Sequence, residues 1–245
     1  MGSSAFYLEF LLSWHGLLVE AGYKNPAIFG LDYTLVPDAS FPAQLHETVH
    51  SYDHVISLAG DASRVCVSGD SAGATLILSL LLHLANPSVA TKQQAISGLS
   101  RDLDKPGMAV LISPWPTLVS HQYKNTTSDY LDERALQTYS AQYAGSESAV
   151  TNPLASPGSC KDIAWWKKAS PAGGIFVTYG QEEVFAPEIR DLVKLLEGAG
   201  ILVGAEAEAG GIHAWPVASL FLSSSTEQRL KGLRGIVIKV KEGIC

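Results

Sequence analysis

The chain has 245 residues, of which 47% are hydrophobic and 17% are charged, and its formal net charge is −7. A chain of this length and composition can fold as one soluble domain with a sizeable core, and the lack of a Lys/Arg cluster excludes nucleic acid and an anionic membrane as expected partners. Residues 6–19 form the most apolar early stretch, but they include polar residues, are too few to cross a bilayer, and lack the flanks of a signal peptide. We therefore expect neither a transmembrane segment nor a signal peptide.

The three cysteines are an odd number and lack the spacing of metal ligands. We interpret them as reduced and non-catalytic, which favours an intracellular setting. They are Cys66, Cys160 and Cys245.

Two hydrophobic patterns alternate along the chain, namely helical spacing of apolar residues and short apolar runs. In chain order they predict a helix over 5–21, a strand over 27–33, a helix over 42–58, a strand over 64–68, a helix that includes 75–82, a polar stretch over 86–105, a strand over 108–112, a strand over 175–179, a helix over 187–197, a strand around 201–203 and a helix over 227–241. This alternation predicts an α/β fold with a mostly parallel sheet that helices cover on both faces.

The sequence Gly-Asp-Ser-Ala-Gly occupies residues 69–73, between an expected strand and an expected helix. This arrangement is typical of a nucleophile elbow, in which a serine lies on a sharp strand-to-helix turn. Glycines two residues before and after the serine allow the neighbouring chain to approach closely. We therefore predict that Ser71 is a nucleophile and that the backbone amide of Ala72 points towards a developing oxyanion. A chance match to the motif is the alternative, and the flanking strand and helix weaken it.

A serine nucleophile requires a base within hydrogen-bond reach and an acid that orients the base. With the serine on an elbow of this kind, both groups are expected later in the chain, each on a loop after a late strand. His213 follows the strand expected around 201–203 and is the candidate base, with a structural role as the alternative. Glu182 and Glu183 follow the strand over 175–179, so either can be the acid, and a solvated pair of turn carboxylates is the other interpretation.

Three further histidines, His46, His50 and His54, share one face of a predicted helix, a spacing that suggests a metal site. No acidic or cysteine cluster accompanies them, and we therefore predict no metal site. The remaining histidines are interpreted as structural: His15, His83 and His121.

Residues 114–173 differ from the rest of the chain, since they are rich in proline, serine and aromatic residues and carry mixed short helical patterns. They can form either a cap over a site or an ordinary long surface excursion. The cap is the favoured interpretation, because connections of this length in compact domains are usually functional.

Five ordered segments, distributed along nearly the whole chain, look like family motifs: Leu31-Asp32-Tyr33-Thr34-Leu35 through Phe41 to Glu47, Gly69 to Gly73, Ser113-Pro114-Trp115, Gly180 to Phe185, and His213-Ala214-Trp215-Pro216. With them the chain resembles the hormone-sensitive-lipase-like α/β-hydrolases, and among these the fungal steryl acetyl hydrolase and arylacetamide-deacetylase-type branch. The resemblance implies an α/β-hydrolase fold in a single domain, residues 1–245, with residues 114–173 as a helical cap insertion. In the acid loop of this family the acid precedes an apolar pair, which favours Glu183 over Glu182.

The resemblance further implies a serine carboxylic-ester hydrolase that removes a short acyl group, such as acetyl, from a bulky apolar alcohol. Its catalytic residues would be Ser71, His213 and Glu183, with the amide of Ala72 as an oxyanion donor, and it would need no metal or organic cofactor. The expected partner is a small apolar ester. An amidase or a deacetylase could use the same residues.

The family also carries an HGGG loop upstream of these motifs, and its amides complete the oxyanion hole. Residues 2–4 of the present sequence align only with positions after that loop, so we expect an N-terminally shortened α/β-hydrolase. A catalytically impaired or non-catalytic binding protein of the same fold is the alternative function. Fungal relatives can be anchored to the endoplasmic reticulum by an N-terminal segment, so the expected location is cytoplasmic or associated with that membrane.

Overall fold

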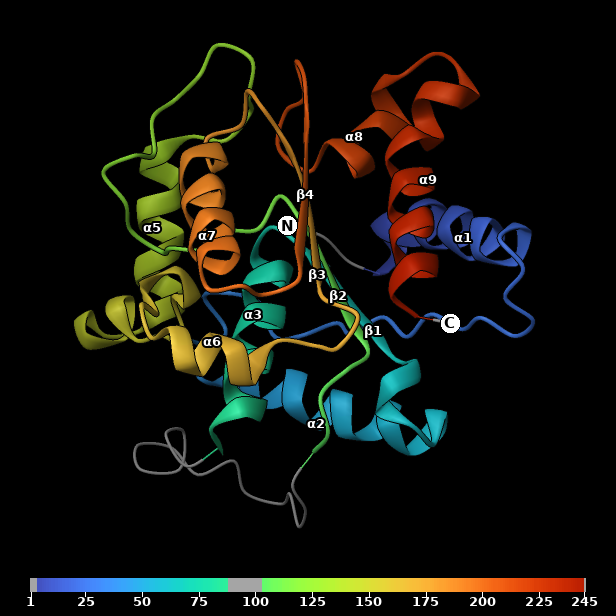
Figure 1. Cartoon of the computed structure of the whole chain (residues 1–245). Coiled ribbons are helices and arrows are strands. Elements are labelled where there is room, and N and C mark those ends of the chain that lie inside the picture. The colour runs from blue at the N-terminus through green and yellow to red at the C-terminus, as the bar shows by residue number, and fades with distance from the viewer. Residues whose placement is uncertain (1–3, 88–102, 245) are drawn as a thin grey trace.

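The structure, a computed structural model, describes residues 4–87 and 103–244 (Figure 1). Most of the polar stretch expected over 86–105, together with residues 2 and 3 and Cys245, lies outside the described residues. The strands are β1 (Cys66–Asp70), β2 (Met108–Ile112), β3 (Ile175–Gly180) and β4 (Val203–Glu208). The α-helices are α1 (Ser4–Glu20), α2 (Ala43–Ala59), α3 (Ala72–Ala85), α5 (Glu133–Ala144), α6 (Ile163–Ala169), α7 (Ala186–Gly198), α8 (Trp215–Leu222) and α9 (Thr226–Gly243), and short 3-10 helices are η1 (Ala62–Arg64), η2 (Glu147–Thr151) and η3 (Pro157–Ser159).

The strands form one sheet in the order β1-β2-β3-β4, and every neighbouring pair is parallel. This agrees with the predicted α/β-hydrolase fold and its parallel sheet. Parallel strands all run in the same direction, so their carboxyl ends lie along one edge of the sheet. That edge carries the ends of the four strands, at Asp70, Ile112, Gly180 and Glu208.

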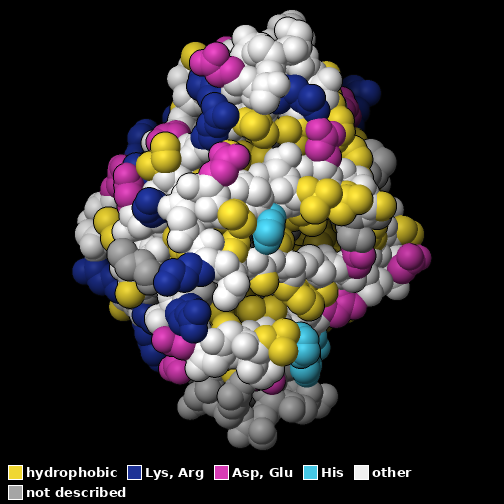
Figure 2. Space-filling view, turned by 90° about the vertical axis from the view of Figure 1, so that its right-hand side faces the viewer, with side chains coloured by type: hydrophobic (Ala, Val, Ile, Leu, Met, Phe, Trp, Pro, Cys, Tyr) yellow, Lys and Arg dark blue, Asp and Glu magenta, His cyan; other side chains and the backbone are white. Residues whose placement is uncertain are grey.

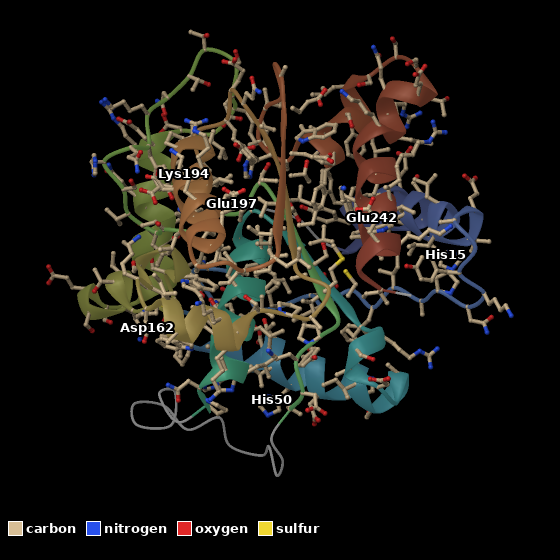
Figure 3. All side chains as sticks on the ribbon, in the orientation of Figure 1. His15, His50, Asp162, Lys194, Glu197 and Glu242 are labelled. Carbon is tan, nitrogen blue, oxygen red and sulfur yellow. The ribbon has the colours of Figure 1, made fainter. Side chains whose placement is uncertain are left out.

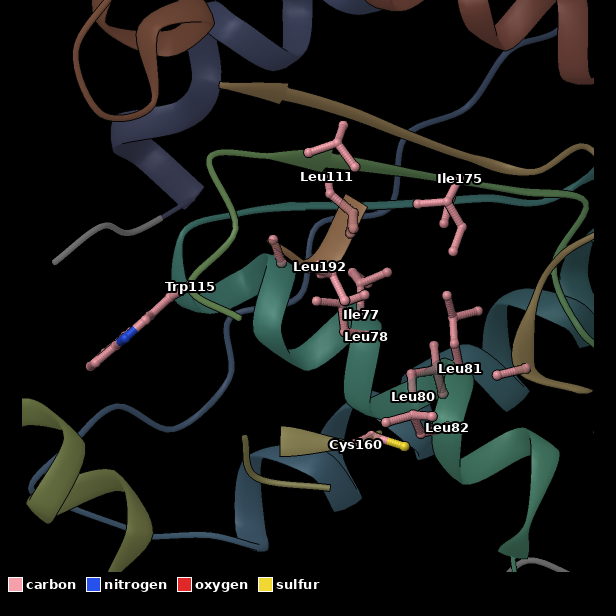
Figure 4. Packing of buried hydrophobic residues seen from close by; sticks show 14 of the residues in the cluster. Ile77, Leu78, Leu80, Leu81, Leu82, Leu111, Trp115, Cys160, Ile175 and Leu192 are labelled. Carbon is pink, nitrogen blue, oxygen red and sulfur yellow. The ribbon is translucent and has the colours of Figure 1, made fainter. Parts of the chain in front are cut away.

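Each face of the sheet carries its own hydrophobic core, because successive side chains of a strand point to opposite faces. In β2, Ala109 and Leu111 belong to the core formed with α2, α3, α6 and α7, whereas Val110 and Ile112 belong to the core formed with α1, α8 and α9. Figure 1 shows α3, α6 and α7 on one side of the sheet and α1, α8 and α9 on the other, as predicted, and Figure 4 shows the first core around α3.

The strand expected over 27–33 is wrong. These residues are not part of any strand in the structure, and their apolar side chains are largely exposed; Phe29, for example, is 51% exposed. An apolar run becomes a strand only where a neighbouring strand pairs with its backbone, and the described residues place none beside it. As a result this segment and α1 contribute apolar side chains to the surface, and Figure 2 shows hydrophobic patches among interspersed charges on the side of the molecule that carries α1.

The strand expected around 201–203 lies further along, as β4. Ile201 is buried and Leu202 already accepts a hydrogen bond from the amide of Ile175, but the regular ladder begins only at Val203. The strand is mostly exposed and alternates small residues with glutamates, so it lacks the apolar pattern by which strands are recognised.

The segment over 114–173 contains α5, η2, η3 and α6. Its buried side chains, among them Trp115, Leu118 and Trp166, belong to the same core as α3 and α7. The part before α5 continues to the carboxyl edge of the sheet, where Tyr130 lies against the His213 ring with 5.8 Å between the ring centroids.

Candidate active site

Ser71 lies at the turn between β1 and α3, at the carboxyl edge of the sheet. Its backbone adopts φ 54° and ψ −120°, a region that non-glycine residues rarely occupy and that costs energy to maintain. The turn is held from β2, because the Ser71 amide donates to the carbonyl of Ile112 (3.0 Å) and the Trp115 amide donates to the carbonyl of Ser71 (3.2 Å). Ser71 is half-buried and Ala72, the first residue of α3, is exposed, so the turn faces the surface.

The tight turn requires a glycine at position 69. A Cβ there would lie 2.4 Å from the backbone carbon of Gly73, a separation that no real structure tolerates. A Cβ on Gly73 would meet nothing within 4 Å. The expectation that both glycines permit close approach therefore holds for Gly69 and is wrong for Gly73.

Glu183 lies in the turn after β3, and its carboxylate is buried. It is only 2% exposed, and its Oε2 atom accepts hydrogen bonds from the Gly180 amide (2.9 Å) and from Ser113 Oγ (2.6 Å). Glu182, in contrast, is exposed, and its amide donates to the carbonyl of Gly211. Of the two candidate acids, Glu183 is the one whose carboxylate points into the protein.

The imidazole of His213 faces the carboxylate of Glu183. Nδ1 of His213 lies 3.8 Å from Oε1 of Glu183, which is longer than a hydrogen bond but within the range of an ion pair. Both atoms are buried, and among the described residues neither has a hydrogen-bond partner. Because buried polar atoms are nearly always paired, these two atoms are placed to pair with each other after a small movement.

Two aromatic rings contact the imidazole of His213. Phe185 and Tyr130 both meet the His213 ring edge to face, with centroid separations of 5.1 and 5.8 Å. Phe185 is completely buried, whereas Tyr130 is 62% exposed, so the imidazole contacts both a ring of the core and a ring at the surface.

Residues 180–185, the acid loop, carry Glu183, and residues 209–214, the histidine loop, carry His213. The two loops approach each other closely at two glycines. A Cβ on Gly180 would lie 2.2 Å from the carbonyl oxygen of Gly211, and the Glu182 amide donates to that same oxygen. The backbone contact brings the end of β3 next to the loop that carries His213. Glycine at position 180 is therefore required for the two loops to meet.

Two residues that the sequence analysis did not assign to the site also contact these loops. Ser113, at φ 44° and fully buried, donates to Glu183 and accepts from the amide of Ala214 (2.9 Å). Asp129 accepts from the amides of Val184 (2.9 Å) and His213 (3.0 Å). Ser113 belongs to the Ser-Pro-Trp segment, so a sequence signal marked its position but not its role, whereas nothing in the spacing of Asp129 distinguishes it from a surface carboxylate.

Asp70, directly before Ser71, is a half-buried residue whose carboxyl group has a raised pKa. Burial is the main cause, and the hydrogen bond from Tyr7 Oη (2.7 Å) and the charge of His213 oppose it. Burial, followed by the charge of Asp70, also raises the pKa of Tyr33 to about 12. The tyrosines around the turn therefore stay neutral at physiological pH.

A profile of the family described as alpha/beta hydrolase fold matches residues 15–217. The chain belongs to the α/β-hydrolase-fold family. The resemblance expected from the five sequence motifs is confirmed.

Two sequence relatives and one solved structure illustrate the family. The Schizosaccharomyces pombe protein named "Putative steryl acetyl hydrolase mug81" is 31% identical over 175 residues, which cover 68% of this chain and 43% of that protein. An acetyl-hydrolase of Streptomyces hygroscopicus is 28% identical over 224 residues, 84% of this chain and 67% of that protein. An esterase from the bacterial hormone-sensitive lipase family superposes with a TM-score of 0.78 at 22% identity, covering all of this chain and 73% of that one. The chain thus spans less than half the length of its S. pombe relative.

His15, His50 and Cys66 lie outside this site. His15 lies on α1 and His50 on α2, both away from the carboxyl edge of the sheet (Figure 3). Within residues 4–87 and 103–244, no group of three or more histidine, cysteine, aspartate or glutamate side chains could hold a metal ion. Burial raises the pKa of the Cys66 thiol to about 12, so this free cysteine remains a thiol rather than a thiolate.

Among the helices of residues 4–87 and 103–244, none is both long and apolar enough to cross a membrane.

Proposed function

We propose that this chain is a serine carboxylic-ester hydrolase that removes a short acyl group from an apolar alcohol. Ser71 is the nucleophile, His213 is the general base and acid, and Glu183 orients His213. The amide of Ala72 is a donor to the oxyanion. Residues 1–245 act as one domain in this proposal, and residues 114–173 form the insertion, whose aromatic side chains near the carboxyl edge of the sheet line the substrate site.

The buried pair of His213 and Glu183 carries the proposal. Burying a carboxylate is costly in free energy unless the carboxylate is hydrogen-bonded, and Glu183 is only 2% exposed. One of its oxygens accepts hydrogen bonds from two donors, and the other lies 3.8 Å from Nδ1 of His213. Such an arrangement fixes the imidazole tautomer with its proton on Nδ1 and leaves Nε2 free to accept a proton. Ser71, on the strained turn at the same sheet edge, supplies the hydroxyl that this base would activate.

In the first half of the reaction, Ser71 Oγ attacks the ester carbonyl carbon while its proton passes to Nε2 of His213. The carbonyl oxygen becomes an oxyanion, to which the amide of Ala72 donates at the N-terminal end of α3, where the helix dipole also favours negative charge. The imidazolium that forms is stabilised by the carboxylate of Glu183. The proton on Nε2 is then transferred to the alcohol oxygen, the carbon–oxygen bond breaks, and the acyl group remains on Ser71.

In the second half, a water molecule attacks the acyl carbon and gives its proton to Nε2 of His213. The second tetrahedral intermediate collapses, the proton returns to Ser71 Oγ, and the carboxylic acid leaves. Every proton in this cycle moves through one imidazole, so the mechanism requires no metal ion and no organic cofactor.

The choice of a short acyl group rests on the relatives. The names of the S. pombe and S. hygroscopicus relatives refer to acetyl hydrolysis, and the two proteins align with 68% and 84% of this chain. The choice of an apolar alcohol rests on the aromatic content of residues 114–173 and on Tyr130, whose exposed ring lies beside His213. An apolar surface next to the histidine would bind the alcohol half of the ester by removing it from water.

The test is hydrolysis of p-nitrophenyl acetate and p-nitrophenyl butyrate by the purified chain and by Ser71→Ala. We expect turnover by the wild type and only background hydrolysis by the variant, with a preference for acetate over butyrate. A fluorophosphonate probe should label the wild type on Ser71 and leave Ser71→Ala unlabelled, which reports the nucleophile independently of turnover.

A matched pair of variants tests the acid. Glu183→Gln should lower kcat by about 10⁴-fold, the size of effect seen when a triad acid is made neutral, whereas Glu182→Gln should change kcat by less than about twofold. Circular dichroism verifies that each variant is folded. Equal background rates in the folded wild type and in Ser71→Ala would contradict the proposal and favour the alternative, a non-catalytic binding protein with a hydrolase fold.

A further inference from the structure

Residues 126–130 cross the acid loop just before α5. Thr126 Oγ1 donates to the carbonyl of Glu182 (2.9 Å), and Oδ2 of Asp129 accepts from the amide of Val184 (2.9 Å). These two bonds hold the backbone on both sides of Glu183. Side chains of residues 126–130 therefore bind the backbone of the acid loop, and the carboxylate of Glu183 remains available to face His213.

The same segment also holds the histidine loop. Oδ1 of Asp129 accepts from the amide of His213 (3.0 Å), and Tyr130 Oη donates to the carbonyl of His213 (3.3 Å). The side chain of Asp129 is itself oriented from within the segment, because its Oδ1 also accepts from the amide of Tyr130 and its backbone amide donates to Thr126 Oγ1. A single carboxylate thus links both loops, with one oxygen on each.

We propose that Asp129 is a positioning residue for the hydrolase reaction, whose carboxylate sets the separation between Glu183 and His213 by binding the amides of Val184 and His213 at the same time. This inference rests on the proposed function, in which that separation matters. Asp129 touches neither the substrate nor the reacting atoms and acts through the two loops.

The separation of 3.8 Å between Nδ1 of His213 and Oε1 of Glu183 makes this positioning consequential. Closing it by about 1 Å converts the contact into a charge-assisted hydrogen bond, and opening it by the same amount removes the contact. A displacement of about 1 Å in a catalytic arrangement can cost 10²-fold in rate. Releasing one loop from Asp129 leaves the distance to be set by flexible backbone alone.

Two effects of Asp129 can be distinguished by mutation: the effect of its charge on His213 and the effect of its hydrogen bonds on the position of the two loops. The imidazole of His213 lies opposite the carboxylate of Glu183 and beside the ring of Tyr130, its charge acts on Asp70, and its backbone amide donates to Asp129, so a change at Asp129 could act through its charge alone. Asparagine removes the charge but keeps one acceptor oxygen, which can hold one of the two amides, whereas alanine holds neither. A charge effect makes the two variants equal, and a positioning effect makes alanine the worse.

The experiment compares Asp129→Ala and Asp129→Asn with Asp162→Ala in p-nitrophenyl acetate hydrolysis. Asp162, on the outer side of the molecule at the start of α6, is a matched control because its carboxylate also accepts from two backbone amides, those of Ala164 and Trp165 (Figure 3). We expect Asp129→Ala to lower kcat by about 100-fold with KM changed by less than about threefold, and Asp129→Asn to fall between it and the wild type. Asp162→Ala should keep kcat within about twofold of the wild type while losing a helix cap.

A second readout does not depend on activity. The resonance of the proton on Nδ1 of His213, observed by ¹H NMR in protein labelled with ¹⁵N-histidine, reports the contact with Glu183. In Asp129→Ala it should move to the position that it takes in Glu183→Gln, and the double variant should show no further change, since both substitutions remove the same contact. Asp162→Ala should leave it unmoved.

The outcomes separate this inference from the proposed function. A chain without esterase activity whose Nδ1 resonance responds to Asp129→Ala as to Glu183→Gln would support the positioning role while the proposed function fails. An active chain in which Asp129→Ala leaves kcat and the resonance unchanged would overturn the inference. Equal losses in Asp129→Ala and Asp129→Asn would also overturn it, because a charge effect would then suffice.

Discussion

The hydroxyl group of Ser113 gives the sharpest quantitative prediction. Ser113 Oγ donates to Oε2 of Glu183 at 2.6 Å and accepts from the amide of Ala214 at 2.9 Å, so one buried atom joins the acid to the residue after His213. Ser113→Ala removes both bonds and leaves the backbone in place. Ser113→Gly also removes both, but it relieves the positive φ of 44° at this position.

The expected magnitude depends on the two bonds. A hydrogen bond to a charged group contributes about 1.5–3 kcal/mol, and at 1.36 kcal/mol for each factor of ten this corresponds to a loss of about 10- to 150-fold in kcat if the bond acts on the orientation of Glu183. The loss should be partial, because the amide of Gly180 still donates to the same oxygen at 2.9 Å. The unpaired amide of Ala214 should lower the free energy of unfolding by about 1–3 kcal/mol in both variants, with Ser113→Gly about 1 kcal/mol more stable than Ser113→Ala.

The assay measures kcat for p-nitrophenyl acetate together with urea unfolding of the wild type and the two variants. Equal losses of kcat in Ser113→Ala and Ser113→Gly, with unequal stabilities, would separate the hydroxyl from the backbone strain. The reasoning is refuted if Ser113→Ala retains the kcat of the wild type, or if Ser113→Gly recovers it.

Two further predictions concern stability and the approach of the loops. Burial, together with the charge of His46, lowers the pKa of His83 from 6.5 to about 4, so this residue binds more protons in the unfolded chain between these values, and it should contribute at most about 3 kcal/mol to a rise in the free energy of unfolding from pH 4 to pH 6.5. Urea unfolding across this range should show that His83→Gln flattens the rise, and an unchanged slope would show that other groups cause it. Gly180→Ala forces a Cβ to within 2.2 Å of the carbonyl oxygen of Gly211, so it should destabilise the fold by about 1–3 kcal/mol and lower kcat. The control is Gly198→Ala, whose Cβ would meet nothing within 4 Å and which should change neither stability nor kcat. A wild-type kcat in Gly180→Ala would contradict the requirement for glycine at position 180.

The sequence predicted the fold well where a local pattern determines an element. Helical periodicity located α1, α2, α7 and α9 to within a few residues, and short apolar runs located β2 and β3. It failed over 27–33, where an apolar run has no strand to pair with among the described residues, and it misplaced β4, whose exposed small and acidic residues lack the pattern of a strand. Both errors concern pairing between distant segments, which local periodicity does not encode.

The candidate site divides in the same way. Ser71 and His213 were identified from the residues around them, and Glu183 was favoured through the register of a motif; their catalytic roles stay predictions. Ser113 and Asp129 were not assigned to the site, because their contacts are with residues 70 and 84 positions away in the chain and depend on how the loops fold back. Such contacts exist only in three dimensions.

The packing of α1 against α9 has a consequence for how the chain is made. The buried side chains Phe10, Trp14 and Leu17 of α1 share a core with Leu233 and Ile236 of α9, and these helices lie at residues 4–20 and 226–243. A ribosome that adds about 5–20 residues per second needs about 10 to 40 s to reach α9 after α1 has been made. During that interval the apolar face of α1 lacks the helix that covers it in the finished protein, so we expect α1 to be open to chaperone binding until α9 is made.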